Sequence, residues 1–155
     1  MRISNRTTAM LVLAAAISMD AGGRAGAEDA LTVFAITGDA ILAPLGALSG
    51  DAARGLAIIR DRGLGNCLIC HALPLSDEMF QGEIGPSLAG AGSRFSPGQI
   101  RLRLVDQSRL TPNALMPPYY RVDGLTNVAG EYLGRPALDA QQIEDVVVYL
   151  AGLKE

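Results

Sequence analysis

Five consecutive residues hold every cysteine and the single histidine of this 155-residue chain. Their order, Cys67-Leu68-Ile69-Cys70-His71, is the C-x-x-C-H sequence that is typical of covalent c-type haem attachment. Two thiols separated by two residues can both reach the vinyl groups at one porphyrin edge, and the imidazole that follows can bind one axial face of the iron. The sequence therefore predicts one haem c, attached through Cys67 and Cys70, with His71 as an axial ligand.

The same cysteine spacing also occurs in three other kinds of site. A thioredoxin-like redox pair should begin a helix after a strand, and this chain shows no alternation of strand and helix patterns. A structural zinc site needs four nitrogen or sulfur ligands, whereas the cysteines and the histidine number three. A disulfide between residues this close would constrain the unfolded chain little. Haem attachment is therefore the favoured interpretation.

The second axial ligand is predicted to be a methionine. No second histidine is available, and Met1, Met10 and Met19 lie in a segment that we expect to be removed, so Met79 and Met116 remain. Met116 is favoured, because it lies far enough downstream of the haem motif for one helix and a return loop to the other face. Two prolines follow it and would stiffen the ligand loop. Met79 is interpreted as an ordinary core or surface methionine.

Further groups are candidates for orienting or contacting the haem. The carbonyl of Pro86, in a Gly85-Pro86 turn, could accept a hydrogen bond from Nδ1–H of His71 and fix the ring. A haem with histidine and methionine on its two faces transfers electrons and leaves no open iron position. Its propionates need cationic partners, for which four arginines are candidates: Arg94, Arg101, Arg103 and Arg121.

The first 27 residues have the pattern of a secretory signal peptide. Arg2 and Arg6 form a basic start, residues 9–19 form an apolar core, and small residues at 25–27 match a cleavage site. The apolar run is shorter than the roughly 20 residues that a transmembrane helix needs. We therefore expect a bacterial periplasmic protein with no membrane span after cleavage. An uncleaved N-terminal anchor is the alternative.

Composition and charge exclude some classes of partner. The chain has 13 Lys and Arg against 16 Asp and Glu, a net charge of −3. This acidic balance disfavours nucleic acid and anionic membranes as partners. With no tryptophan and 5% aromatic residues, the core must be built from aliphatic side chains around something larger. A haem would be that larger group.

Three helices are predicted to position these residues. Each begins at a residue that commonly caps a helix N-terminus, namely Asp51, Ser96 and Asp139. Apolar side chains recur with helical spacing behind each cap. The expected helices cover residues 52–61, 97–108 and 139–153.

The rest of the chain is predicted to be arm and loops. Residues 28–50 are apolar but broken by glycine and proline, and are expected to form an extended arm with a short strand at 31–36. Gly- and Pro-rich loops then wrap the cofactor. The predicted organisation is a signal peptide at 1–27, the arm at 28–50 and an all-α haem domain at 51–155.

Several stretches resemble known proteins. The haem motif, the loop Gly85-Pro86-Ser87-Leu88, the loop Leu115-Met116-Pro117-Pro118 and the apolar C-terminal helix resemble class I cytochromes c. Residues 38–45, 50–55 and 65–71 are similar to SoxX, the small monohaem subunit of the SoxXA cytochrome of bacterial sulfur oxidation. The resemblance covers residues 36–153. It implies a small class I cytochrome c-like fold with covalent haem at the two cysteines, and with the histidine and Met116 as axial ligands.

The resemblance also implies a function. The SoxXA complex joins thiosulfate oxidatively to a cysteine of a SoxYZ-type carrier, an L-cysteine S-thiosulfotransferase reaction that releases two electrons. Both cysteines of this chain would be consumed by haem thioethers, so no thiolate remains to act as a nucleophile. We therefore expect a non-catalytic electron-relaying subunit in a heterodimer with a larger SoxA-type cytochrome, supplying electrons to a downstream cytochrome.

Alternative functions remain. The chain could be a free-standing periplasmic electron-transfer cytochrome, or the cytochrome subunit of another dehydrogenase. The apolar arm favours a subunit of a complex. A thiol–disulfide oxidoreductase is a third alternative, and the absence of bound haem would identify it.

Overall fold

The computed structural model describes residues 31–154, and the predicted signal peptide at 1–27 lies outside them. Within this part of the chain, helices are joined by long loops without a β-strand, which confirms the all-α prediction. None of its helices is both long enough and apolar enough to cross a membrane. The α-helices are α1 (Ala52–Arg60), α2 (Ala91–Arg94), α3 (Pro97–Asp106) and α4 (Ala140–Gly152), and short 3₁₀ turns lie at Leu45–Ala47, Cys67–Ile69, Gln107–Arg109 and Gly130–Tyr132.

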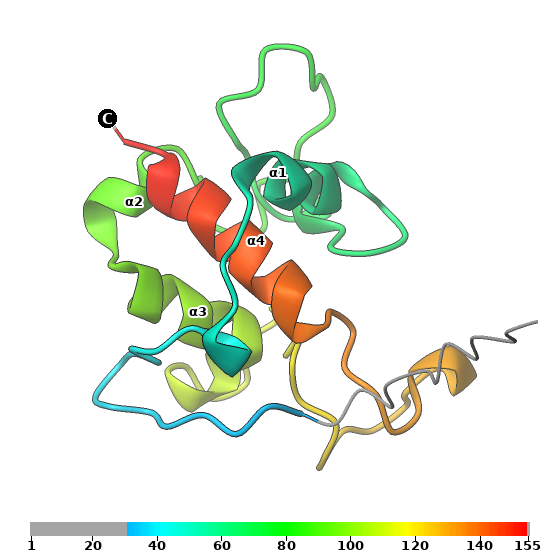
Figure 1. The fold of residues 1–155 in the computed structure, drawn as a ribbon. Helices are drawn as coiled ribbons and strands as arrows, with labels where there is room; N and C mark the ends of the chain where they lie inside the picture. Colours follow the sequence, from blue (N-terminus) through cyan, green and yellow to red (C-terminus); the bar gives the residue numbers. More distant parts are fainter. Residues whose placement is uncertain (1–30, 155) are drawn as a thin grey trace, which may run out of the picture.

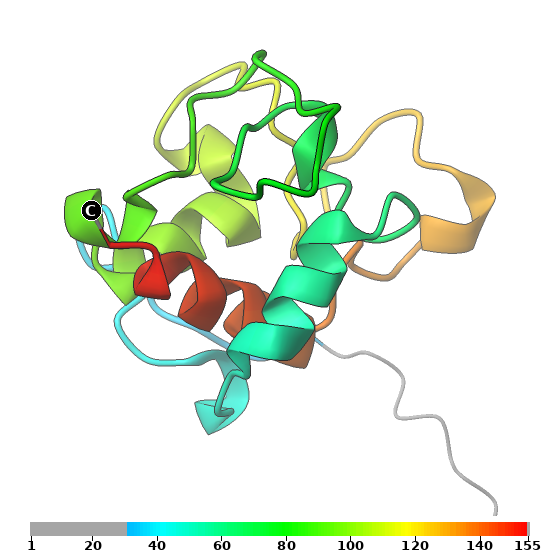
Figure 2. The same ribbon diagram turned by 90° about the horizontal axis from the view of Figure 1, so that it is seen from above.

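Helix α4 is the central element of the fold. It crosses the middle of the molecule, with α1 packed on one side and α3 on the other (Figures 1 and 2). The crossing with α1 is very close, since a Cβ on Gly55 would lie 2.1 Å from the carbonyl oxygen of Asp145. Side chains such as Ile59, Leu102 and Ile143 are at most 1% exposed between these helices. Each contributes roughly 1.5–3 kcal/mol by leaving water.

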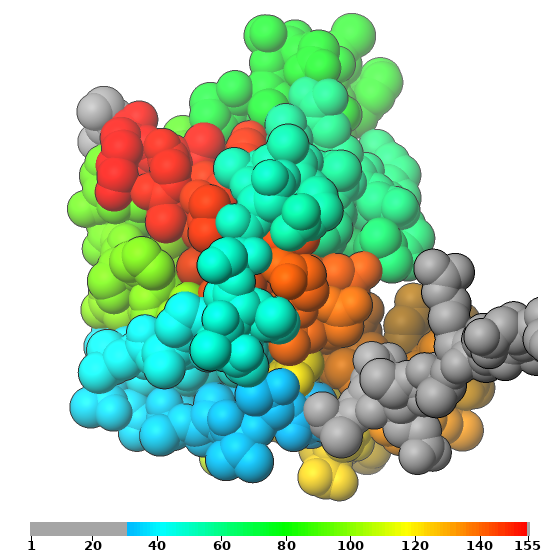
Figure 3. All heavy atoms as spheres, viewed as in Figure 1, coloured from blue at the N-terminus to red at the C-terminus, as the bar shows by residue number. Residues whose placement is uncertain are grey.

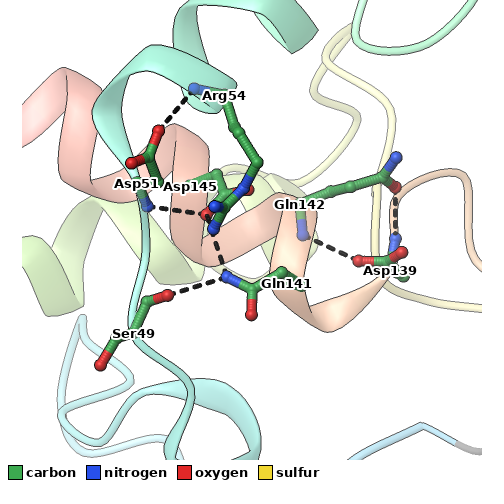
Figure 4. A network of polar contacts seen from close by, with 7 residues as sticks. All are labelled: Ser49, Asp51, Arg54, Asp139, Gln141, Gln142 and Asp145. Atoms are coloured by element: carbon green, nitrogen blue, oxygen red, sulfur yellow. Dashed lines mark hydrogen bonds and ion pairs between the residues drawn. The ribbon is translucent and has the colours of Figure 1, made fainter.

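Side-chain caps fix where α1 and α4 begin. Asp51 accepts a hydrogen bond from the Arg54 N–H at 2.8 Å, and Asp139 forms a reciprocal capping box with Gln142. Asp145 joins the two helix ends, because it accepts from the Asp51 N–H and from the Arg54 guanidinium, each at 2.7 Å (Figure 4). The start of α1 is therefore attached to the first turns of α4.

Helix α3 also begins as predicted, with a capping box between Ser96 and Gln99. Its predicted end at residue 108 is two residues too late. The backbone leaves the helical region at Asp106, whose side chain accepts from the Ser108 N–H, and the chain continues as a 3₁₀ turn. Local side-chain bonding of this kind competes with the helix.

The short strand expected at residues 31–36 is absent, so that prediction is wrong. No neighbouring strand is available in the described chain, and the Thr32 N–H donates instead to the Tyr120 hydroxyl at 2.8 Å. The first part of the described arm runs along the lower edge of the domain, and the last part, up to residue 50, crosses in front of α4 to reach α1 (Figures 1 and 3). Ile41 and Leu45 are each 1% exposed and belong to the core. The arm is thus an ordered part of the folded domain.

A buried ion pair fixes the arm to the helices. Arg101 of α3 and Glu144 of α4 are 3% and 2% exposed and share two hydrogen bonds of 2.7 Å. Arg101 also donates to the Ile41 carbonyl, and Glu144 accepts from the Leu45 N–H. Two backbone groups of the arm are therefore satisfied by one buried pair.

The loops lie on one side of this frame. Residues 72–90 arch over the haem motif, and α2, which was not predicted, follows them (Figure 2). Residues 122–137 extend from the body of the molecule in both views. These segments leave the space between α1, α3 and α4 open on one side, where the candidate site lies.

Candidate functional site

The haem motif forms a tight 3₁₀ turn at the end of the segment that follows α1. Asn66 enters it in the left-handed conformation, with φ 48°, and the N–H groups of Cys70 and His71 both donate to the Cys67 carbonyl at 3.1 and 2.9 Å. The turn buries Leu68 in the core. Both cysteines are partly buried and form no disulfide.

One cavity brings the predicted site residues together. It measures about 720 Å³, within the usual range for small-molecule and cofactor sites. Cys67, Cys70, His71, Pro86 and Met116 all line it. Its walls also include aliphatic side chains of α1, α3 and α4, among them Ile59, Ile100, Leu104, Val146 and Leu150. The lining of the cavity is therefore mainly apolar, and its polar groups include two cysteines and a histidine that can form covalent bonds or bind a metal.

The histidine ring is held in place from one side. Its Nδ1 lies 2.7 Å from the Pro86 carbonyl oxygen, so the hydrogen bond expected from the sequence is present. With Nδ1–H donating, Nε2 remains as the nitrogen that can bind a metal. Gly85 makes room for the ring, because a Cβ there would lie 2.3 Å from Cε1 of His71.

The cysteine environment does not suit a reactive thiolate. Burial raises the pKa of Cys67 to about 11, and the neighbouring Cys70 adds to the rise. Catalytic and redox-active cysteines need a lowered pKa and an electropositive surrounding. The described residues also contain no group of three His, Cys, Asp or Glu side chains that could hold a metal ion on their own. Neither the thiol-redox nor the zinc alternative gains support.

The structure separates the two candidate methionines. Met116 lines the cavity and packs against the core, on the loop that returns from α3. Met79 is 84% exposed on the loop of residues 72–90 and does not line the cavity. Of the two methionines, only Met116 thus lies where its side chain borders the cavity, and its role as a ligand stays a prediction.

The four candidate arginines fall into two pairs. Arg101 and Arg121 do not line the cavity, because they pair with the buried carboxylates of Glu144 and Asp106. Arg94 and Arg103 do line it. Arg94 donates a hydrogen bond to the Ser87 carbonyl. The guanidinium carbon of Arg103 lies 4.1 Å from the centre of the Phe95 ring. Of the four candidates, only Arg94 and Arg103 therefore border the cavity, and a contact with haem propionates stays a prediction.

Sequence analysis missed Tyr119, which lines the cavity and is 8% exposed. Burial raises its pKa above the usual value, and the two cysteines contribute to the rise. Its hydroxyl donates to the carbonyl oxygen of Gly65 at 2.7 Å. The one signal in the sequence is its place just after the two prolines of the Met116 loop.

The residues present fit a haem. The cavity is mainly apolar, two cysteines and an oriented histidine lie on its wall, and Met116 lines it from another loop. An all-α domain that places these groups around one cavity is a class I cytochrome c-like protein.

Comparison with known proteins gives the family. No protein-family model matches the chain, and no curated protein matches it either. A solved structure, the crystal structure of SoxXA from P. pantotrophus, contains a chain that is 35% identical, with a TM-score of 0.73. The match covers 79% of this chain and 95% of that chain. The chain belongs to the SoxX family, as the sequence resemblance indicated.

Proposed function

We propose that this chain is the monohaem c-type cytochrome subunit of a SoxXA-type complex and relays electrons during thiosulfate oxidation. One haem c is attached through Cys67 and Cys70, with His71 and Met116 as axial ligands. The observation that carries this proposal is the convergence of all four side chains on one apolar cavity. A bound haem of this type supplies reversible one-electron transfer.

The chain's own residues prepare the site for this role. The Pro86 carbonyl accepts from Nδ1–H of His71, which leaves Nε2 as the nitrogen that can bind the iron. The aliphatic walls exclude water and keep the surroundings at low dielectric, and a thioether ligand raises the reduction potential of a haem. His71 and Met116 would be the two side chains that hold the iron, and with both bound the site would leave no open position for a substrate.

The sulfur chemistry belongs to a partner in this proposal. A carrier cysteine thiol and thiosulfate give the cysteine S-thiosulfonate, one proton and two electrons. The sulfur–sulfur bond that forms lies between the carrier cysteine and thiosulfate, and neither sulfur comes from this chain. Because one haem takes one electron at a time, the two electrons must leave in separate transfers.

The family comparison supports the proposed assembly, since the similar chain belongs to a structure of SoxXA. We propose a heterodimer with a larger SoxA-type cytochrome, a SoxYZ-type carrier as the substrate protein, and a downstream cytochrome as electron acceptor. The periplasm is the proposed compartment. Residues 1–27 would direct export as a signal peptide and would then be cleaved.

Co-purification tests this function directly. A tag after Glu155 would recover the protein from the periplasm, followed by haem staining and mass spectrometry of the intact chains. A mass increase of one haem on this chain, with a larger cytochrome in one-to-one ratio, supports the proposal. A second readout tests electron relay: the haem of this chain should become reduced when thiosulfate and the carrier protein are added to the complex.

A monomer that is red, stable and active alone would contradict the subunit role. It would favour the alternative of a free-standing electron carrier. A chain without haem absorbance would contradict the cytochrome assignment itself.

A further inference from the structure

Tyr119 connects two segments that lie far apart in the sequence. It follows Met116 by three residues, and its hydroxyl donates a hydrogen bond of 2.7 Å to the Gly65 carbonyl. Gly65 is buried and precedes Cys67 by two residues. The bond therefore joins the loop of the proposed methionine ligand to the turn that carries the proposed thioether bonds.

The backbone of Tyr119 also forms hydrogen bonds to two other segments. Its N–H donates to the Leu104 carbonyl of α3 at 3.1 Å, and its own carbonyl accepts from the Leu138 N–H at 3.0 Å. Two residues further on, Arg121 donates to Asp106 at the end of α3 at 2.9 Å. The chain leaving the Met116 loop is thus anchored along α3, and the tyrosine ring projects from it across the cavity wall to Gly65.

We propose that Tyr119 is a positioning residue that holds Met116 on its face of the haem. Through the Gly65 carbonyl, Tyr119 ties the ligand loop to the segment that carries the two proposed haem attachment cysteines. This proposal rests on the ligation proposed above, and it adds the residue that sets how readily the methionine leaves.

The physical basis is the cost of a buried acceptor without a partner. If the hydroxyl is removed, the Gly65 carbonyl stays buried unless the loop moves outward to admit water. Outward movement of this loop carries Met116 away from the cavity. The ligand equilibrium should therefore shift by about tenfold, the scale of one buried hydrogen bond.

The test uses the holoprotein with the substitution Tyr119→Phe. Imidazole competes with methionine for ferric haem, so its affinity measures how tightly the ligand loop is held. We expect imidazole to bind about tenfold more tightly to the variant than to the wild type. The weak charge-transfer band of methionine-bound ferric haem, followed in the same titration, identifies methionine as the displaced ligand.

The neighbouring tyrosine provides a matched control. Tyr120 is also buried, but its hydroxyl accepts a hydrogen bond from the Thr32 N–H in the arm. Tyr120→Phe removes the same atom from the adjacent residue and should leave imidazole affinity unchanged. An equal shift in both variants would show general loosening of the fold and overturn the proposal, as would an unchanged affinity in Tyr119→Phe.

The two proposals fail in different ways. If the wild-type protein has no methionine charge-transfer band, the ligation itself is wrong and the positioning role goes with it. If the band is present and only the imidazole shift is missing, the ligation stands and the positioning role is refuted.

A measurement on the wild type keeps the proposal testable if Tyr119→Phe does not fold. Hydrogen exchange is compared with and without bound imidazole. We expect displacement of Met116 to increase exchange at residues 64–70 as well as in its own loop, because the tyrosine links them. Faster exchange confined to the Met116 loop would overturn the proposal.

Discussion

Arg101 and Glu144 form an ion pair between α3 and α4 that is almost fully removed from solvent, with two hydrogen bonds of 2.7 Å. Both side chains also form hydrogen bonds with the arm: Arg101 donates to the Ile41 carbonyl, and Glu144 accepts from the Leu45 N–H. Loss of one partner leaves a buried charge without compensation, which typically costs about 3–5 kcal/mol. The pair therefore controls whether helices and arm stay together.

We expect Glu144→Gln to lower the free energy of unfolding by about 3–5 kcal/mol, because Arg101 stays buried and charged. Urea unfolding of the holoprotein, followed by circular dichroism, measures this change. The control is Asp77→Asn, which weakens the solvent-exposed pair with Arg60 and should change the free energy of unfolding far less. Equal losses in the two variants would contradict a special role for the buried pair.

Gly85→Ala should disturb the histidine ring. The added Cβ would lie 2.3 Å from Cε1 of His71, so either the ring or the Pro86 turn must move. We expect a lower yield of protein with haem bound, and an altered haem spectrum in whatever folds. The matched control is Gly130→Ala, where nothing lies within 4 Å of the added atom. Similar haem yields in both variants would show that space at Gly85 is not limiting.

Substitution of the two methionines distinguishes the ligand. Met116→Ala should open one axial position, so that ferrous haem in the variant binds carbon monoxide and the reduction potential falls. Met79→Ala removes a side chain that is 84% exposed and outside the cavity, and should change neither property. Carbon monoxide binding by the second variant alone would reverse the assignment.

Acid should weaken the junction between α1 and α4. Burial by itself would raise the pKa of Asp145, but hydrogen bonds from Arg54, the Asp51 N–H and Gln141 outweigh it and hold the pKa below its usual value. Ionised Asp145 therefore stabilises the folded state above the unfolded-chain pKa of about 4, and this contribution is lost as pH falls through the lower folded pKa.

The measurement is urea unfolding from neutral pH downward. Stability should fall less steeply with acid in Asp145→Asn than in the wild type, because the substituted side chain does not titrate. Asp123→Asn, at an exposed loop position, should retain the wild-type slope. If the free energy of unfolding fell with the same slope against pH in all three proteins, ionisation of Asp145 would not contribute to stability.

Sequence patterns located the three long helices well, because each has a capping residue and an apolar face. Helix α2 escaped prediction, since four residues with a glycine carry no helical periodicity. The expected strand at 31–36 failed for a different reason. Its composition suits a strand, but pairing depends on a partner that the folded domain does not provide.

For the site too, some residues could be predicted from the sequence and others could not. Cys67, Cys70, His71, Pro86 and Met116 could be named from spacing and residue chemistry, and the structure brings them to one cavity. Which arginines face that cavity depends on buried carboxylates from other helices, and no local pattern shows these. The hydrogen bond of Tyr119 joins residues 54 positions apart, so it too depends on tertiary structure.

The close crossing of Gly55 with the backbone of Asp145 has a consequence for the order of events during synthesis. The ribosome completes α1 and the haem motif long before it makes α4, on which α1 packs. Until then α1 has no surface to bury its apolar face against, and Ile41 lacks the helix whose Arg101 satisfies its carbonyl. The domain closes only when its last helix arrives, so the segment with both cysteines spends that interval as accessible chain.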